Sequence, residues 1–210
     1  MEISIPINSN TIKGTLTLLE KTKGLVIFAH GSGSSRFSKR NNFVATLLNR
    51  ASFSTLLFDL LTEQEGKIDE HTREFRFNIP LLAERLILVT KWIRDNKSTA
   101  LLPIGYFGAS TGAAATLIAA AQLSHTVAAV VSRGGRPDLA EGYLSRVQAP
   151  TLLLVGALDD EVIALNKKAL DQLKCTKEMM LIPEATHLFE EPGTLEVVTH
   201  HTIKWFEKYL

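Results

Sequence analysis

The sequence predicts an α/β fold built on a mostly parallel β-sheet. Short runs that are apolar on both sides alternate along the chain with longer segments whose apolar residues recur at helical spacing. Such runs are typical of parallel strands that helices cover on both faces. With 210 residues, the chain has the length of one domain, residues 1–210. The runs are Leu25–Ala29, Thr55–Phe58, Leu102–Phe107, Val127–Val131, Thr151–Val155 and Met179–Ile182.

Five segments between and after these runs are predicted to be helices. In one of them Leu82, Leu86 and Val89 recur at helical steps, and Pro80 stands near the start, where a missing N–H costs little. The segments are Asn42–Arg50, Ile79–Arg94, Gly112–Leu123, Leu165–Leu173 and Leu195–Tyr209.

An antiparallel hairpin is predicted at the start of the chain. Ile3–Ile7 and Thr15–Leu18 each alternate apolar and polar residues, and Asn8–Lys13 joins them. These two strands and the six apolar runs give a sheet of about eight strands. Between Ser132 and Pro150 there is no room for a long helix pair, so no large lid is expected. The charged stretch Thr62–Phe77 is interpreted as a solvated connection, with a mobile rim of the site as the alternative.

Composition limits the possible partners and cofactors. Lysine and arginine total 23 and aspartate and glutamate total 22, a balance that gives no electrostatic signal for nucleic acid or an anionic membrane. A single cysteine, Cys175, excludes an internal disulfide framework and suits a reducing compartment. The first residues, MEISIPINSN, lack a secretory pattern, so a cytoplasmic protein is expected. No metal site and no cofactor are predicted, because the adjacent His200 and His201 diverge on a helix.

The motif Gly108-Ala109-Ser110-Thr111-Gly112 has the form G-x-S-x-G. It follows an apolar run and opens an alanine-rich helical segment, which is the strand–turn–helix setting that a nucleophilic serine requires. Glycines beside the serine permit a tight, strained turn. Ser110 is therefore the candidate nucleophile, and a glycine–serine helix cap without chemistry is the alternative.

A base and an acid are predicted on later loops of the same sheet edge. His187 follows the last strand, and Asp159 follows the preceding strand, three residues after Gly156. Asp160 competes with Asp159, and turn chemistry or an exposed loop histidine are the non-catalytic alternatives. The chain order Ser110, Asp159, His187 is that of the α/β hydrolases and differs from the trypsin-like and subtilisin-like orders.

Backbone amides near Ser32 and at Thr111 are the candidates for an oxyanion hole. The stretch HGSGSS, residues His30–Ser35, follows a strand, and its small residues let the backbone approach a ligand. A flexible or phosphate-binding glycine loop is the alternative, but the stretch lacks the ending of a Walker motif.

The sequence resembles small α/β hydrolases of the dienelactone-hydrolase-like group over nearly its whole length. The motifs that carry the resemblance are HGSGSS, GASTG, GALDDEV and ATHLF. The resemblance implies an α/β-hydrolase fold, a Ser110–Asp159–His187 triad, and oxyanion amides near Ser32 and at Thr111. Dienelactone hydrolases use a cysteine nucleophile, and Ser110 stands at that position here, which makes dienelactone itself a doubtful substrate.

Two arginines are candidates for binding an anionic part of the substrate. Arg133 follows the strand after the nucleophile, and Arg36 lies just past the glycine-rich loop. Guanidinium groups hold carboxylates and phosphates through paired N–H donors, and the resemblance also implies arginines that hold a substrate carboxylate. The structural alternative is that Arg133 pairs with Asp138 or Asp59, or donates to loop carbonyls.

The sequence thus predicts a serine hydrolase that cleaves a small carboxylic ester through an acyl-enzyme. Thioesterase, amidase or peptidase activity would use the same groups. A non-catalytic binding protein on a hydrolase fold is the alternative from another class. The expected partner of the predicted hydrolase is a small-molecule ester, with an anionic ester as one hypothesis, and the oligomeric state is left open.

Overall fold

The computed structural model describes all 210 residues and contains one eight-stranded sheet with the strand order β1-β2-β4-β3-β5-β6-β7-β8. The predicted hairpin is present, and it is tighter than expected because only Asn8 and Ser9 separate the paired residues Ile7 and Asn10. β1 pairs antiparallel with β2, β2 pairs antiparallel with β4, and every later pairing is parallel. The strands are β1 (Glu2–Ile7), β2 (Asn10–Thr17), β3 (Leu25–Ala29), β4 (Ser54–Phe58), β5 (Ile104–Ala109), β6 (Val127–Arg133), β7 (Thr151–Gly156) and β8 (Lys177–Ile182).

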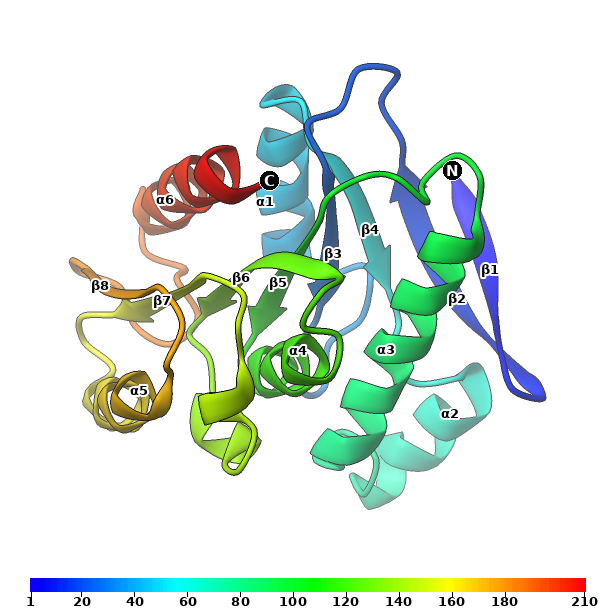
Figure 1. Ribbon diagram of the computed structural model, residues 1–210. Helices are drawn as coiled ribbons and strands as arrows, with labels where there is room; N and C mark the ends of the chain where they lie inside the picture. The colour runs from blue at the N-terminus through cyan, green and yellow to red at the C-terminus, as the bar shows by residue number, and fades with distance from the viewer.

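Helices cover both faces of the sheet (Figure 1). α1 (Lys39–Arg50) and α6 (Thr194–Tyr209) lie on one face, and α3 (Ile79–Asp95), α4 (Thr111–Gln122) and α5 (Asp160–Gln172) lie on the other. Alternate residues of each parallel strand point to opposite faces, so Leu25 and Ile27 enter one buried cluster while Val26 and Phe28 enter the other. The predicted α/β class, with an apolar layer on each side of the sheet, is confirmed.

The charged stretch after β4 is a correction to the sequence analysis. It contains the helix α2 (Glu63–Thr72) rather than only a solvated connection. Thr62 caps this helix, since its hydroxyl accepts the Glu65 N–H while the Glu65 carboxylate accepts the Thr62 N–H. Sequence reasoning could have found this capping box, but the helix has no apolar face to reveal it.

Between β6 and β7 the chain forms only the short 3₁₀ helices η1 (Pro137–Ala140) and η2 (Leu144–Arg146), and no large lid is present. The carboxyl ends of β5, β7 and β8 are therefore joined to their helices by loops at one uncovered edge of the sheet. No helix is long and apolar enough to cross a membrane.

Candidate active site

Ser110 occupies the turn between β5 and α4. Its backbone has φ 49° and ψ −121°, a strained region for a residue with a side chain. Hydrogen bonds hold the turn in place: the Ser110 N–H donates to the Arg133 carbonyl over 3.3 Å, and the Ser110 carbonyl accepts from the Arg136 N–H over 3.1 Å. The strand–turn–helix setting predicted for Ser110 is therefore present, with the strain expected of an exposed nucleophile.

The two glycines of the motif allow very close backbone packing. A Cβ atom at Gly112 would lie 2.3 Å from the carbonyl oxygen of Ala29, and one at Gly108 would lie 2.5 Å from Cα of Ala113. No side chain fits at either position without movement of the backbone. The glycines thus fix the start of α4 against β3 and β5 and aim Ser110 at the sheet edge.

His187 and Asp159 meet by a direct hydrogen bond. Nδ1 of His187 lies 2.7 Å from Oδ2 of Asp159, while Oδ1 of Asp159 accepts from the Val162 N–H over 3.5 Å as the cap of α5. With the proton on Nδ1, the Nε2 atom of His187 is left as an acceptor. Asp160, the sequence competitor, is the first residue of α5 and forms no hydrogen bond with His187.

Ser110 and His187 line the same cavity, which has a volume of about 210 Å³ and includes Ser32. No hydrogen bond joins Ser110 Oγ to His187. Such contacts are often long without substrate and tighten when substrate binds. The three residues that the sequence placed on separate loops are therefore gathered at one point of the sheet edge.

The glycine-rich loop after β3 passes directly beside Ser110. A Cβ atom at Gly31 would lie 3.1 Å from Cβ of Ser110, so the loop backbone approaches closely because Gly31 has no side chain. The Ser32 N–H donates to no acceptor of the chain, and Thr111 is the first residue of α4, where an N–H has no acceptor within the helix. Both amides are available to an anionic oxygen.

His30 fixes the base of this loop. Its Nε2 accepts the Leu60 N–H over 3.1 Å, and its Nδ1 lies 2.9 Å from the Gly31 carbonyl oxygen. Burial lowers the pKa of His30, which keeps the ring neutral and able to accept the Leu60 bond. The loop is thus tied to the end of β4.

Arg133 is buried beside the same cavity and has no carboxylate partner. The residue is only 7% exposed, and its single side-chain bond runs from Nη2 to Oδ1 of Asn41 over 3.1 Å. Nε and Nη1 are buried without any partner, and the guanidinium lies about 6 Å from the rings of Phe107 and Phe189. Burial, with the charge of Arg40, lowers the pKa of Arg133 to about 9.

The lining of the cavity contains two arginines and no carboxylate. The second arginine is Arg40, in the first turn of α1, which donates to the Leu188 carbonyl and to the exposed Glu190. Sequence reasoning missed Arg40 and Asn41, because nothing in their local pattern shows that the start of α1 faces β6. Arg133 remains the buried positive charge without a counterion.

The other predicted arginine is already neutralised. Arg36 forms an ion pair with Asp59 and a second, weaker one with Glu2, so the physical basis for predicting it as a substrate-binding residue is lost. Asp138, one proposed structural partner of Arg133, instead pairs with Arg136 through two bonds of 2.8 and 2.9 Å. The alternative that Arg133 pairs with Asp138 or Asp59 is therefore wrong.

The comparisons with known proteins agree with this architecture. No family model matches the chain. The structure of a dienelactone hydrolase from Anabaena variabilis ATCC 29413 is 52% identical, with a TM-score of 0.99 over 100% of this chain and 97% of that one. Est1E from Butyrivibrio proteoclasticus shares the fold at 15% identity, with a TM-score of 0.82 over 99% and 98% of the two chains.

Two curated relatives from strains of Mycobacterium tuberculosis carry the provisional name phosphoribosyl transferase. They are 52% identical over 209 residues, which is 100% of this chain. The chain spans 46% of the length of these relatives.

The fold and the arrangement of groups at the sheet edge define an α/β hydrolase. Within that class, the identity of 52% to the Anabaena protein over nearly the whole of both chains decides the family. The chain belongs to the dienelactone-hydrolase-like group of α/β hydrolases.

Proposed function

We propose that the protein is a serine hydrolase that cleaves a small carboxylic ester through an acyl-enzyme. The hydrogen bond between His187 and Asp159, in the same cavity as the strained Ser110, carries this proposal. The three side chains have the chemistry of a nucleophile, a base and an orienting acid, and they come from three different loops. Ser110 stands at the position where dienelactone hydrolases have their nucleophilic cysteine, so the proposed nucleophile is a serine.

The proposed reaction begins with attack of Ser110 Oγ on the ester carbonyl. His187 Nε2 takes the hydroxyl proton, and Asp159 holds Nδ1–H and stabilises the positive ring. The N–H groups of Ser32 and Thr111 bind the oxygen as it becomes negative. His187 then gives its proton to the leaving alcohol, and a water molecule activated by His187 releases the acid and restores Ser110.

The buried charge of Arg133 favours a substrate with an anionic group near the ester. An unpaired guanidinium beside a cavity without carboxylates is costly, and an anionic group of the substrate in that cavity would offset its charge. Arg36 has no part in this proposal, since Asp59 already holds it.

Two other kinds of activity are to be distinguished from ester hydrolysis. Thioesters and amides would pass through the same acyl-enzyme, and competition between matched substrates separates them. Phosphoribosyl transfer, which the name of the mycobacterial relatives suggests, concerns proteins of which this chain covers 46%. Incubation with a phosphoribosyl diphosphate and a nucleobase tests it, and turnover that survives Ser110→Ala would support it.

A fluorophosphonate probe tests the proposal directly, because only an activated serine reacts with it quickly. The wild type should be labelled at Ser110 and should hydrolyse p-nitrophenyl acetate. Ser110→Ala should lose both, with a fall in kcat on the order of 10⁴–10⁶. Ser34→Ala, which alters another serine of the same cavity, is the matched control and should keep the label. Retention of more than about a tenth of the activity in Ser110→Ala would overturn the assignment.

A further inference from the structure

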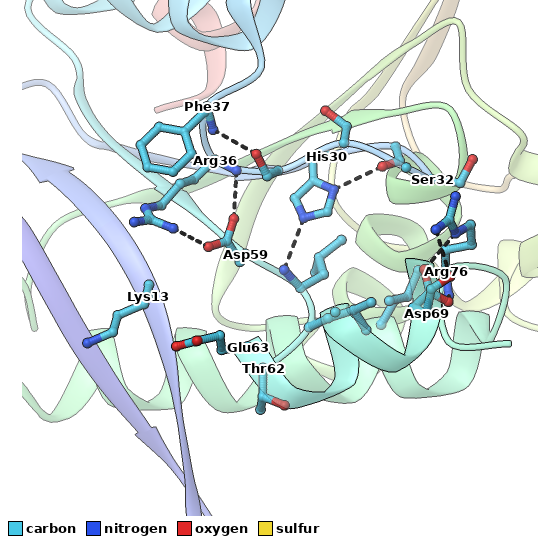
Figure 2. A pocket seen from close by; sticks show the side chains of 18 of the residues that line it. Lys13, His30, Ser32, Arg36, Phe37, Asp59, Thr62, Glu63, Asp69 and Arg76 are labelled. Atoms are coloured by element: carbon cyan, nitrogen blue, oxygen red, sulfur yellow. Dashed lines mark hydrogen bonds and ion pairs between the residues drawn. The ribbon is translucent and has the colours of Figure 1, made fainter. Parts of the chain in front are cut away.

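A second and larger cavity adjoins the candidate active site. Its volume is about 530 Å³, and it shares Gly31, Ser32 and Ser34 with the cavity that holds Ser110. Figure 2 shows it between the glycine-rich loop, the end of β4 and the helix α2. A substrate bound at Ser110 can therefore extend past the glycine-rich loop into this space.

One face of α2 forms a wall of the larger cavity. Glu63, Gly66, Asp69 and Glu70 all line it, and their spacing places them on one side of the helix. Most helices turn an apolar face inward, but Asp69 is the only buried residue of α2. The inward face of this helix is polar, which suits a cavity wall and would not suit a core.

Ion pairs at the two ends of α2 hold it in place. Glu65 accepts from Arg85 over 2.6 Å, and Asp69 accepts from the side chain of Arg76 over 2.6 Å and from two backbone N–H groups. These bonds hold α2 against the rest of the protein without any of its side chains filling the cavity. A Cβ atom at Gly66 would have nothing within 4 Å, so this position of the wall is left open.

Most of the charged side chains that line the cavity form ion pairs, and the partner of Glu63 is Lys67, which does not line it. Arg36 pairs with Asp59 on one wall and Arg76 pairs with Asp69 on the other, as Figure 2 shows. Lys13 donates to a serine hydroxyl outside the cavity. Only four of the 19 residues that line the cavity are hydrophobic, so polar groups stand among apolar atoms of the backbone and side chains. The walls offer fixed donors and acceptors without a strong net charge, and hydroxyl groups, which both donate and accept, match such walls.

The position of the cavity assigns it to the acyl side of the ester. The leaving oxygen must lie near His187, since that ring protonates it. His187 follows β8 and lines the smaller cavity, whereas the larger cavity lies beyond the glycine-rich loop at the ends of β3 and β4 and does not include His187. β5, which leads to Ser110, lies between these two sides in the strand order.

We propose that the larger cavity is an acyl-binding subsite for a hydroxyl-rich group, such as a polyhydroxylated ring or chain. The proposal rests on the proposed function for its assignment to the acyl side. It names a substrate class by chemistry: an ester or lactone whose acid carries several hydroxyl groups. Where a site pairs its polar groups with substrate hydroxyls, an analogue without them leaves those groups unsatisfied and is rejected.

Matched methyl esters test the proposal. The specificity constant kcat/KM is measured for the methyl esters of a trihydroxylated and of an unsubstituted cyclohexanecarboxylic acid. It is also measured for the esters with an aminated or a carboxylated ring. The trihydroxylated ester should be preferred over the unsubstituted one by at least about tenfold. Equal rates would show that the cavity holds only water, and a preference for the aminated or carboxylated ring would show that it reads charge. Either result would overturn the proposal.

Gly66→Leu tests the location of the subsite. It places a side chain on the cavity-facing side of α2 and replaces a poor helix former by a good one, so the helix should form at least as well. The preference for the hydroxylated ester should disappear in this variant. Gln64→Leu, at an exposed position of the same helix that does not line the cavity, should keep both the preference and the hydrolysis of p-nitrophenyl acetate. If Gly66→Leu keeps it too, the subsite lies elsewhere.

Binding to Ser110→Ala separates this proposal from the proposed function. Calorimetric titration with the trihydroxylated methyl ester should show binding that Gly66→Leu removes, whether or not Ser110 is the nucleophile. Failure of Ser110-dependent hydrolysis with binding intact would sink the serine mechanism alone. Hydrolysis of p-nitrophenyl acetate without hydroxyl-dependent binding would sink the subsite alone.

Discussion

Replacement of Arg133 by methionine should make the protein more stable and a worse catalyst for an anionic ester. The guanidinium is buried with only Asn41 as a side-chain partner, and two of its nitrogens have none. Methionine fills a similar length of space with apolar atoms and can lie against the rings of Phe107 and Phe189. The two effects have opposite signs because the same unpaired charge is costly in the empty protein and useful with substrate bound.

The size of the stabilisation follows from the pKa of Arg133. The fall of this pKa to about 9 from the ordinary value of a guanidinium corresponds to about 5 kcal/mol of unfavourable free energy, at about 1.36 kcal/mol per pKa unit. Loss of the hydrogen bond to Asn41 offsets about 1 kcal/mol of this, and imperfect packing of methionine offsets more. A net gain of roughly 2–4 kcal/mol would raise Tm by about 10 °C in a chain of this size.

The gain should depend on pH in a defined direction. Below pH 9 Arg133 carries its proton in both the folded and the unfolded chain, so the full cost is present. As the pH rises above 9 the folded protein loses that proton first, and the wild type gains stability relative to the variant. Urea unfolding at pH 7 and pH 10 should therefore show a smaller difference at the higher pH.

The activity assay compares matched neutral and carboxylate-bearing esters. Arg133→Met should lose roughly 2–5 kcal/mol more transition-state stabilisation on the anionic ester, a further fall in kcat/KM of about 30-fold to several thousand-fold. Arg133→Lys keeps the charge without the paired donors and should fall between the two. Arg50→Met, in the last turn of α1, controls for general loss of charge. A variant that is less stable, or that loses equally on both esters, would refute the reasoning and make Arg133 a structural residue.

Three other changes have expected outcomes. Asp159→Asn should lower kcat on the order of 10⁴ by fixing the wrong tautomer of the base, whereas Asp160→Asn should have little effect; a larger loss at Asp160 in steady-state kinetics would reverse the assignment. Because burial lowers the pKa of His30, the folded state should lose stability as the pH falls below about 6.5, by at most about 1.4 kcal/mol per pH unit, and His30→Gln should flatten this dependence in urea titrations. Gly112→Ala should cost at least about 2 kcal/mol in unfolding free energy or prevent folding, because its Cβ would lie 2.3 Å from the oxygen of Ala29; an unchanged Tm would contradict the described packing.

The strands were predictable from the sequence because burial on both faces leaves a plain signal. β3, β5 and β7 read as continuous apolar runs, and every residue of each is buried. The nucleophile turn was predictable for a related reason, since Ser110 follows such a run and precedes a buried, alanine-rich helix. The sequence pattern therefore predicts structure most clearly where all residues of an element are buried.

The helix α2 and the environment of the arginines were not predictable in the same way. α2 has no apolar stripe, and its attachment depends on ion pairs with Arg76 and Arg85, which lie outside the helix. The isolation of Arg133 depends on a contact with Asn41, which is 92 residues away in sequence. Such long-range pairings leave no local pattern in the sequence. They determine that Arg36 has a carboxylate partner and that Arg133 has none.

The two cavities are lined by different parts of the chain. Bond cleavage is proposed for groups on the loops after β5, β7 and β8, while the larger cavity is walled by the end of β4 and by α2, which precede β5. The two sets share only the short loop after β3. On the two proposals above, exchange of the segment between β4 and α3 for one of different polarity should change which acids are accepted and leave the proposed catalytic residues in place. This segment contributes little to the core, so its sequence can vary in evolution or by design with little effect on the rest of the fold.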